Sequence, residues 1–217
     1  PDLHFYPEGG YLVEGILNKV AVKIKNPIFE NTDLSGILID NEGTEILNFK
    51  TLKFGLGVFS FTPEPNKSYE AIFNVNNIEE HYPLPKALST GYTINVTNNE
   101  DNVVVDVNST TLNGLKGTYL VAHQRGSIVF NKLEEALKKK YSIKFITSEL
   151  QDGVTHLTLF DASGNPVCER LIYINHSNNN AKIEISKSRN SLKTRQKITV
   201  NLDVKNNEEK SWCLLKS

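Results

Sequence analysis

The chain has 217 residues, of which 24 are basic and 25 are acidic, so its formal net charge is -1. Neither sign of charge is collected into a large block, which argues against a nucleic-acid partner. No run approaches the roughly 18 consecutive apolar residues of a membrane-spanning helix, so we expect no membrane span in this sequence. The length suits one or two domains. Frequent short apolar runs separated by Asn, Gly, Asp and Pro favour two all-β units of about 100 residues each.

The first 81 residues contain runs in which apolar and polar residues alternate, as in antiparallel strands with one solvated face. In one run Val20, Val22 and Ile24 are expected to face a core, while the lysines beside them face water. Phe59 and Phe61 are also expected in a core. After a short extended piece at His4–Val13, strands are predicted at Val20–Lys25, Ser35–Asp40, Glu45–Thr51, Val58–Thr62 and Tyr69–Val75. Residues 1–81 are therefore predicted to form one β-sandwich.

The second half of the chain begins after a proline-rich segment, His81–Lys86, which predicts an extended hinge with the domain boundary near residue 81. Seven further strands are predicted at Tyr92–Val96, Val103–Val107, Thr118–His123, Ser127–Phe130, Tyr141–Ile146, Val154–Phe160 and Val167–Ile174. Their number and spacing match an immunoglobulin-like sandwich over residues 82–177. The alternation in the last hairpin places Leu157, Leu159 and Ile172 in its core.

One segment leaves two alternatives open. Asn131 is a suitable N-cap, and Glu134 follows it by three residues and precedes Lys138 by four, so residues 131–140 can form a short helix. A helix of about ten residues is marginal without tertiary support. A polar connection between two strands would have a similar sequence.

The end of the chain predicts an incomplete third unit. After the polar run Asn175–Asn180, strands are predicted at Ala181–Ile185 and Lys197–Val204. Two strands cannot bury a core by themselves, so residues 178–217 are interpreted as the start of a third β unit. Because the sequence contains no Met and begins with Pro1, we also expect it to be a segment of a longer protein.

The residues that could carry chemistry do not form recognisable motifs. The five histidines are scattered, without the spacing of a metal site, at His4, His81, His123, His156 and His176. There is no Gly-x-Ser-x-Gly nucleophile motif, and Cys168 is expected to be a buried free thiol. The hairpin could bring Cys168 near His156, but no third orienting group is apparent. We therefore expect no catalytic, cofactor-binding or metal-ligating residues, no cofactor, and no enzymatic activity.

Two passages resemble one family. The opening FYPEGGYLVEGILNKVAVKI with FGLGVFSFTPEPNKSYEA, and later GVTHLTLFDASGNPVCERLIYI, look like macroglobulin-like domains of bacterial α2-macroglobulin-related proteins. More narrowly, they are similar to repeated modules in large surface or periplasmic proteins of Bacteroidetes-type bacteria, which often carry a TonB-dependent-receptor plug or a carboxypeptidase-regulatory-like domain further on. The likeness covers most of residues 4–204. It implies a string of seven-stranded sandwiches and an extracytoplasmic location, in the periplasm or at the outer membrane and cell surface.

The protease trap of that family does not carry over to this sequence. Trapping in the family depends on an internal thioester formed at a Cys-x-Glu-Gln motif. Cys168 is followed by Glu169 and Arg170, and Cys213 is followed by two leucines, so neither cysteine matches.

These observations lead to two functional hypotheses. The first is a non-enzymatic structural and interaction segment of a larger extracytoplasmic protein, whose sandwiches space or present other domains of that protein. The alternative is a ligand-binding module for a glycan or an extracellular protein, using sandwich loops or the groove between the two domains. Sugar platforms usually expose Trp or Tyr pairs, whereas Trp212 lies in the C-terminal tail and most Tyr and Phe fall in strand patterns, which favours the first hypothesis.

Overall fold

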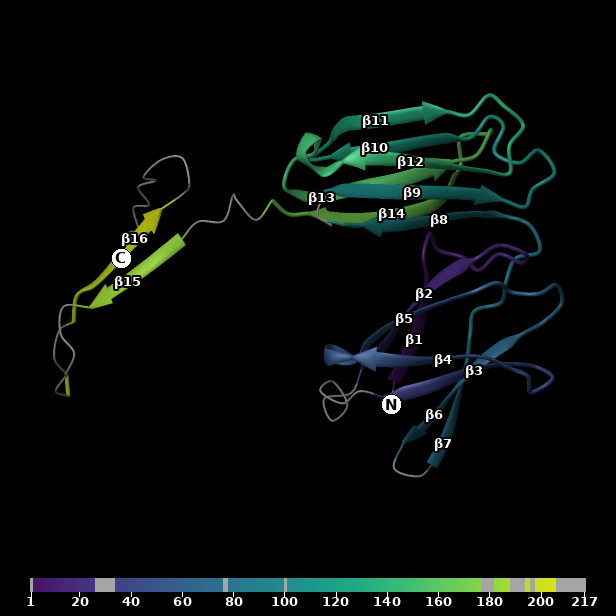
Figure 1. Cartoon of the computed structure of the whole chain (residues 1–217), viewed down its shortest axis with the longest axis horizontal. Coiled ribbons are helices and arrows are strands. Elements are labelled where there is room, and N and C mark those ends of the chain that lie inside the picture. Colours follow the sequence, from purple (N-terminus) through teal and green to yellow (C-terminus); the bar gives the residue numbers. More distant parts are fainter. Residues whose placement is uncertain are drawn as a thin grey trace. The chain divides into compact units, whose positions relative to one another are not determined.

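The computed structural model describes residues 2–25, 34–75, 78–99, 101–176, 182–187, 194–195 and 198–205. Regular structure in these ranges consists of β-strands and two short 3-10 turns, so the predicted all-β fold is confirmed. Residues 1–174 form one compact unit, and residues 175–217 form a second. The first unit contains two antiparallel β-sandwiches that follow each other along the chain (Figure 1).

The first sandwich is one seven-stranded sheet that folds over itself. Its strands are β1 (Asp2–Pro7), β2 (Asn18–Lys25), β3 (Ser35–Asp40), β4 (Glu45–Leu52), β5 (Leu56–Phe61), β6 (Tyr69–Val75) and β7 (Ile78–Pro83). Their order across the sheet is β1-β2-β5-β4-β3-β6-β7, and β4 pairs with β5 at only two positions. Although two strands separate β5 from β6, the rings of Phe61 and Tyr69 are 4.9 Å apart. The sheet therefore bends between β4 and β5, and its two halves face each other.

The core between these halves is rich in aromatic side chains. Phe49 and Phe59 lie 4.6 Å apart, and Phe73 contacts Phe49 edge to face at 5.4 Å. The predicted core residues of this half are all buried, namely Val20, Val22, Ile24, Phe59 and Phe61. Burial of large aromatic side chains is the dominant stabilising contribution in such a core.

The second sandwich consists of two separate sheets. Its strands are β8 (Tyr92–Asn98), β9 (Asn102–Ser109), β10 (Tyr119–Gln124), β11 (Ser127–Leu133), β12 (Lys140–Ile146), β13 (Gly153–Phe160) and β14 (Pro166–Ile174). One sheet has the order β12-β9-β8, and the other has the order β11-β10-β13-β14. Leu157, Leu159 and Ile172 are buried between them, which confirms the predicted core of the last hairpin.

The two sandwiches repeat one strand order. In each, the first, second and fifth strands form one layer, and the fourth, third, sixth and seventh strands form the other. This is an immunoglobulin-like arrangement in which the fourth strand lies beside the third. The sandwiches differ in the connection between their layers. In the first, the fourth and fifth strands (β4 and β5) pair and join the two layers, whereas in the second the corresponding strands (β11 and β12) lie in separate sheets.

The two hydrophobic cores are separate along the chain. The buried cluster of the first sandwich includes Leu84 and Ala87, and that of the second begins at Ile94. The segment His81–Lys86, interpreted as a hinge, contains the end of β7, which pairs with β6. The boundary between the two hydrophobic cores therefore lies between Ala87 and Ile94.

Of the two alternatives left open for residues 131–140, the structure shows the connection between two strands and not the helix. Residues 131–133 belong to β11, and the backbone of Glu134 continues the pairing. Its N–H donates to the Thr118 carbonyl at 2.9 Å, and its carbonyl accepts from the Gly117 N–H at 2.7 Å. The Glu134 carboxylate still lies 3.5 Å from Lys138 Nζ. The charge pair expected of a helix is thus made by an extended connection, because sheet pairing takes the backbone groups that a helix would need.

The second unit contains one antiparallel strand pair, β15 (Lys182–Lys187) and β16 (Val200–Lys205), close to the two predicted strands. Ile183 lies opposite Val204, and Ile185 lies opposite Leu202, so one face of the pair is apolar.

Among the described residues, no helix is long and apolar enough to span a membrane.

Candidate functional site

Several specific contacts form the junction between the two sandwiches of the first unit. The segment from Glu8 to Lys19 belongs to the first sandwich and lies against β8 and β14 of the second. Gly9 forms a β-bridge with Glu169, and Val13 forms another with Leu88. Gly9 has a φ of 86°, and a Cβ at this position would lie 3.3 Å from the backbone nitrogen of Ile94. A glycine is therefore required here by both the backbone conformation and the close approach.

A buried carboxylate ties the two sandwiches together. The Glu8 side chain is 5% exposed, and its Oε1 lies 2.7 Å from Nε of Arg170 on β14. The same oxygen accepts a hydrogen bond from the Val96 N–H on β8 at 3.3 Å, and Oε2 lies 3.1 Å from Lys19 Nζ. Lys19 Nζ also donates to the Val96 carbonyl at 2.8 Å. Glu8 and Lys19 thus satisfy the backbone N–H and the carbonyl of Val96, a residue of the edge strand β8. Because Glu8 and Lys19 are charged, these contacts are stronger than hydrogen bonds between neutral groups.

A cleft of about 490 Å³ lies beside this junction. Its lining residues come from a loop of the first sandwich and from three strands of the second, namely Ile16, Leu17, Asn95, Asp106, Asn108, Lys140, Tyr141 and Ser142. Asn95 Nδ2 donates to the Leu17 carbonyl at 3.2 Å, whereas Asn95 Oδ1 is buried and has no hydrogen-bond partner. The Ser142 hydroxyl donates to the Asp106 carboxylate. The cleft therefore offers hydrogen-bond donors and acceptors above a small aliphatic surface.

The hydroxyl of Tyr141 is also withdrawn from water. Burial raises the pKa of Tyr141 to about 12, and the negative charge of Glu134 acts in the same direction. Tyr141 therefore stays protonated at neutral pH and is not suited to act as a base.

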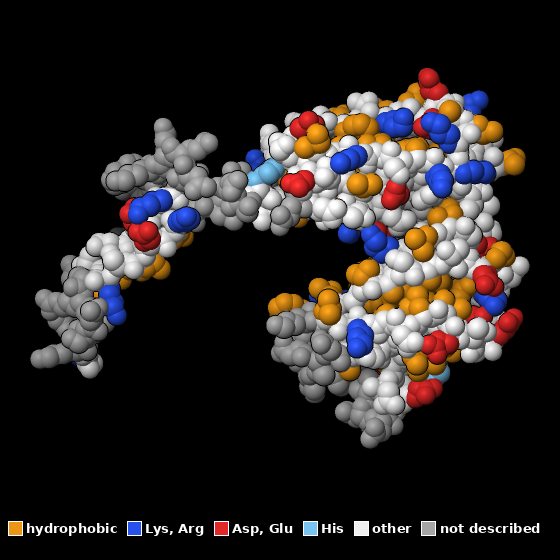
Figure 2. Space-filling view, in the orientation of Figure 1, with side chains coloured by type: hydrophobic (Ala, Val, Ile, Leu, Met, Phe, Trp, Pro, Cys, Tyr) orange, Lys and Arg blue, Asp and Glu red, His pale blue; other side chains and the backbone are white. Residues whose placement is uncertain are grey.

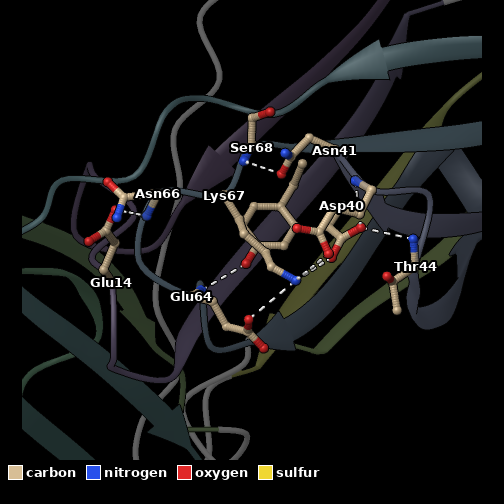
Figure 3. Close-up of polar contacts among 10 residues, drawn as sticks. Glu14, Asp40, Asn41, Thr44, Glu64, Asn66, Lys67 and Ser68 are labelled. Carbon is tan, nitrogen blue, oxygen red and sulfur yellow. Dashed lines mark hydrogen bonds and ion pairs between the residues drawn. The ribbon is translucent and has the colours of Figure 1, made fainter.

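A second cleft, of about 530 Å³, lies in the first sandwich beside a buried ion pair (Figure 3). The Asp40 side chain is fully buried, and its Oδ2 lies 2.7 Å from Lys67 Nζ. Asp40 Oδ1 accepts hydrogen bonds from the backbone N–H groups of Glu42 and Thr44 at 2.9 and 2.8 Å. The hydrogen bond from Lys67, together with these backbone bonds, lowers the pKa of Asp40 to about 2. Lys67 lines the cleft but is engaged by Asp40, so the pair is better suited to holding the turn than to binding a ligand.

An apolar surface lies on the outer side of the first sandwich. Figure 2 shows apolar side chains gathered over the region of β4 and β5. Leu52, Phe54, Leu56 and Val58 are all exposed there, and Tyr6 on β1 is in the same row as Val58 because both pair with Ala21. A cluster of this kind is larger than the singly scattered apolar residues of most surfaces and is typical of interaction sites.

The structure brings two of the scattered histidines together. His123 and His156 lie opposite each other on β10 and β13, and their rings stack with centroids 4.6 Å apart. Glu169 Oε1 is 3.8 Å from Nδ1 of His156. Within the described ranges, no group of three or more His, Cys, Asp or Glu side chains is arranged to hold a metal ion. The carboxylates of Glu70 and Glu79 raise the pKa of His81 on β7.

Cys168 is a buried free thiol, as predicted. Its Sγ lies 3.3 Å from the Tyr92 carbonyl, and burial raises its pKa to about 12. His156 is on the opposite face of the sheet, since its neighbours Thr155 and Leu157 are buried with Cys168. A Cys–His nucleophile is therefore not formed. Cys213 lies outside the described residues.

Sequence reasoning missed the junction, which joins residues far apart in the chain. The local signal was present in Pro7-Glu8-Gly9-Gly10, where an acidic residue precedes two glycines with positive φ and is followed by an apolar run. Its partner in the second sandwich is Arg170 on β14. Glu169 and Arg170 are adjacent, so this strand carries one charge on each face and does not show a clear alternation. No family model and no curated protein matches the chain.

Proposed function

We propose that the chain is a non-enzymatic structural and interaction segment of a larger extracytoplasmic bacterial protein of the α2-macroglobulin-like type, with sandwiches that space and present other domains. The resemblance of the two quoted passages supports the family and the location. The repeated strand order supports a segment built from tandem modules of one topology.

The observation that carries the proposal is the Glu8 network. A spacer transmits position only if its modules do not move independently, so contacts between the two sandwiches must hold them against the inter-domain motion that is otherwise the default. Here a buried carboxylate binds Arg170 of the second sandwich and Lys19 of the first, while Gly9 bridges to β14. The apolar surface around Leu56 and Val58 supports the interaction part of the proposal, because it is available for contact with other domains of the same protein.

The spacer proposal predicts a fixed separation of the two sandwiches. Spin labels at Ser60→Cys on β5 and Ser163→Cys in the β13–β14 turn report this separation by double electron–electron resonance, with Cys213 replaced by Ser. We expect one narrow distance distribution, as narrow as that of a control pair within the second sandwich, Ser127→Cys with Ser163→Cys. A distribution much broader than the control would contradict the spacer function, because it would show that the sandwiches reorient freely.

A second candidate function is ligand binding at the cleft beside the junction. The buried, unpaired Oδ1 of Asn95 favours it, because such groups normally find a partner. A polyhydroxylated ligand such as a glycan can both donate and accept, as this cleft requires. Titration with maltotriose should shift the side-chain amide resonances of Asn95 and Asn108 saturably, and Asp106→Ala should abolish the shifts while Asp101→Ala retains them. Unchanged resonances throughout the titration would argue against this glycan.

A further inference from the structure

His123 and His156 form a cross-strand pair on the outer face of the four-stranded sheet. They lie opposite each other on the neighbouring strands β10 and β13. The residues before and after each histidine are buried, so both imidazoles point away from the core. The two rings are nearly parallel, with an angle of 13° between their planes and 4.6 Å between their centroids. The spacing of the histidines along the sequence gave no sign of this pair, because it forms only when the two strands meet.

Within the described part of the chain, the ring nitrogens of this pair are not taken up by close hydrogen bonds. Nδ1 of His123 is buried and has no hydrogen-bond partner. Glu169 on β14 is near His156, with its Oε1 3.8 Å from Nδ1. His81 differs from both, because its two ring nitrogens lie 3.1 and 3.0 Å from the carboxylate oxygens of two glutamates. The stacked pair therefore keeps nitrogen atoms that can bind a ligand.

Glu169 stands where a metal-binding histidine usually has a carboxylate. A histidine that binds a metal through one ring nitrogen commonly donates the N–H of the other to a carboxylate or a carbonyl. Glu169 lies opposite Thr158 and so shares the outer face with His156. Its backbone is held by the bridge to Gly9. A carboxylate beside Nδ1 of His156 favours the tautomer protonated at Nδ1, which leaves the lone pair of Nε2 for a metal ion.

The distance between the two rings suits a single metal ion. Two nitrogens on one tetrahedral metal lie about 3.3 Å apart, because each metal–nitrogen bond is about 2.0 Å long. The stacked rings can reach this separation by rotation about χ2, a torsion that is broad in histidine. Imidazole nitrogen suits Zn²⁺, Ni²⁺ and Cu²⁺, whereas Ca²⁺ and Mg²⁺ take oxygen ligands. With two protein ligands, water would fill the other positions, so the ion would exchange more readily than in a closed structural site.

We propose that His123 and His156 form a surface site for a divalent transition-metal ion of the imidazole-preferring kind, and that Glu169 orients His156 within it. The ion would join β10 and β13, the two central strands of this sheet. The histidines line neither of the two clefts, so the site is independent of the functions proposed above. Because the pair exists only in the folded sheet, binding should also stabilise the fold.

Calorimetric titration of the full chain with Zn²⁺ tests the proposal. All variants carry Cys213→Ser, because a thiolate is itself a zinc ligand. We expect saturable binding of one ion per chain. Glu169→Gln should weaken the affinity by about tenfold, as loss of an orienting carboxylate does, and His123→Gln should weaken it further. His81→Gln is the matched control, because it also removes an exposed imidazole that lies beside a carboxylate, and it should bind like the wild type.

Nuclear magnetic resonance of the imidazole nitrogens provides a measurement on the unaltered site. Zn²⁺ should shift the ring nitrogens of His123 and His156 together and leave those of His81 unchanged. Without metal, His156 should be protonated at Nδ1, and Glu169→Gln should increase the other tautomer, which a purely structural role of Glu169 would not do. Absence of saturable binding at a large excess of Zn²⁺ would overturn the proposal. Binding that persists unchanged in His123→Gln would overturn it too, because the ion would then lie elsewhere.

Discussion

Replacing Glu8 with Ala is expected to lower the free energy of unfolding by about 2 kcal/mol and to broaden the distance distribution between the two sandwiches. The substitution removes the carboxylate shared by Arg170 and Lys19 and leaves the Val96 N–H without its acceptor. Breaking a fully buried ion pair costs roughly 3–5 kcal/mol, but the side chains of Lys19 and Arg170 are 31% and 45% exposed, so water can take up part of their charge. Urea denaturation measures the stability, and the spin-label pair measures the separation.

Two further variants separate the causes of this effect. Glu8→Gln keeps the shape and one acceptor oxygen but removes the charge, so we expect a smaller loss of stability and an intermediate distribution. Glu149→Ala removes a carboxylate from an exposed position in the second sandwich and should change neither quantity. If Glu8→Ala left both stability and separation unchanged, the junction would not depend on this carboxylate and the spacer proposal would lose its main support.

The local patterns of the sequence were sufficient to predict most strands, because a half-buried strand reports its buried face through period-2 alternation. Leu157 and Leu159 on β13 and Phe59 and Phe61 on β5 are clear cases. The pattern failed for β7, where only Ile78 and Tyr82 are large and apolar and where charged residues and a proline suggested a hinge. β7 forms because it pairs with β6, and Tyr82 packs against Phe73 with their rings 6.0 Å apart. That contact depends on tertiary position and cannot be read from the strand itself.

The same limit explains why the sequence left a helix and a strand connection open for residues 131–140, and why the candidate site was missed. The segment around Glu134 has a helical charge pattern, yet the backbone of Glu134 pairs with Gly117 and Thr118, which the local sequence does not reveal. The junction likewise depends on the meeting of Glu8 with Arg170, which is set by how the two sandwiches pack. Sequence reasoning therefore recovers elements and cores, while contacts between distant elements require the fold.

The second large effect is expected at Asp40, as a dependence of stability on pH. Asp40 has a pKa of about 2, below its ordinary value of 3.8, because it accepts hydrogen bonds from Lys67 and from two backbone N–H groups. A carboxylate with a lowered pKa contributes stability that is fully present above its ordinary pKa and is lost as pH falls toward the folded value. The pKa of Lys67 is raised above its ordinary 10.5, so its contribution is present below that pH and is lost as pH rises above it.

Thermal unfolding of Asp40→Asn and the wild type should therefore show a clear gap in melting temperature at neutral pH, which narrows between about pH 4 and pH 2. Glu42→Gln is the matched control, because Glu42 also lies near Lys67, at 3.6 Å, but its side chain is largely exposed. Exposed ion pairs contribute little, so this variant should follow the wild-type profile. Equal pH profiles for Asp40→Asn and Glu42→Gln would contradict the role of Asp40. The predicted contrast arises because Asp40 is held in a buried turn by three donors, whereas Glu42 contacts the same lysine from solvent.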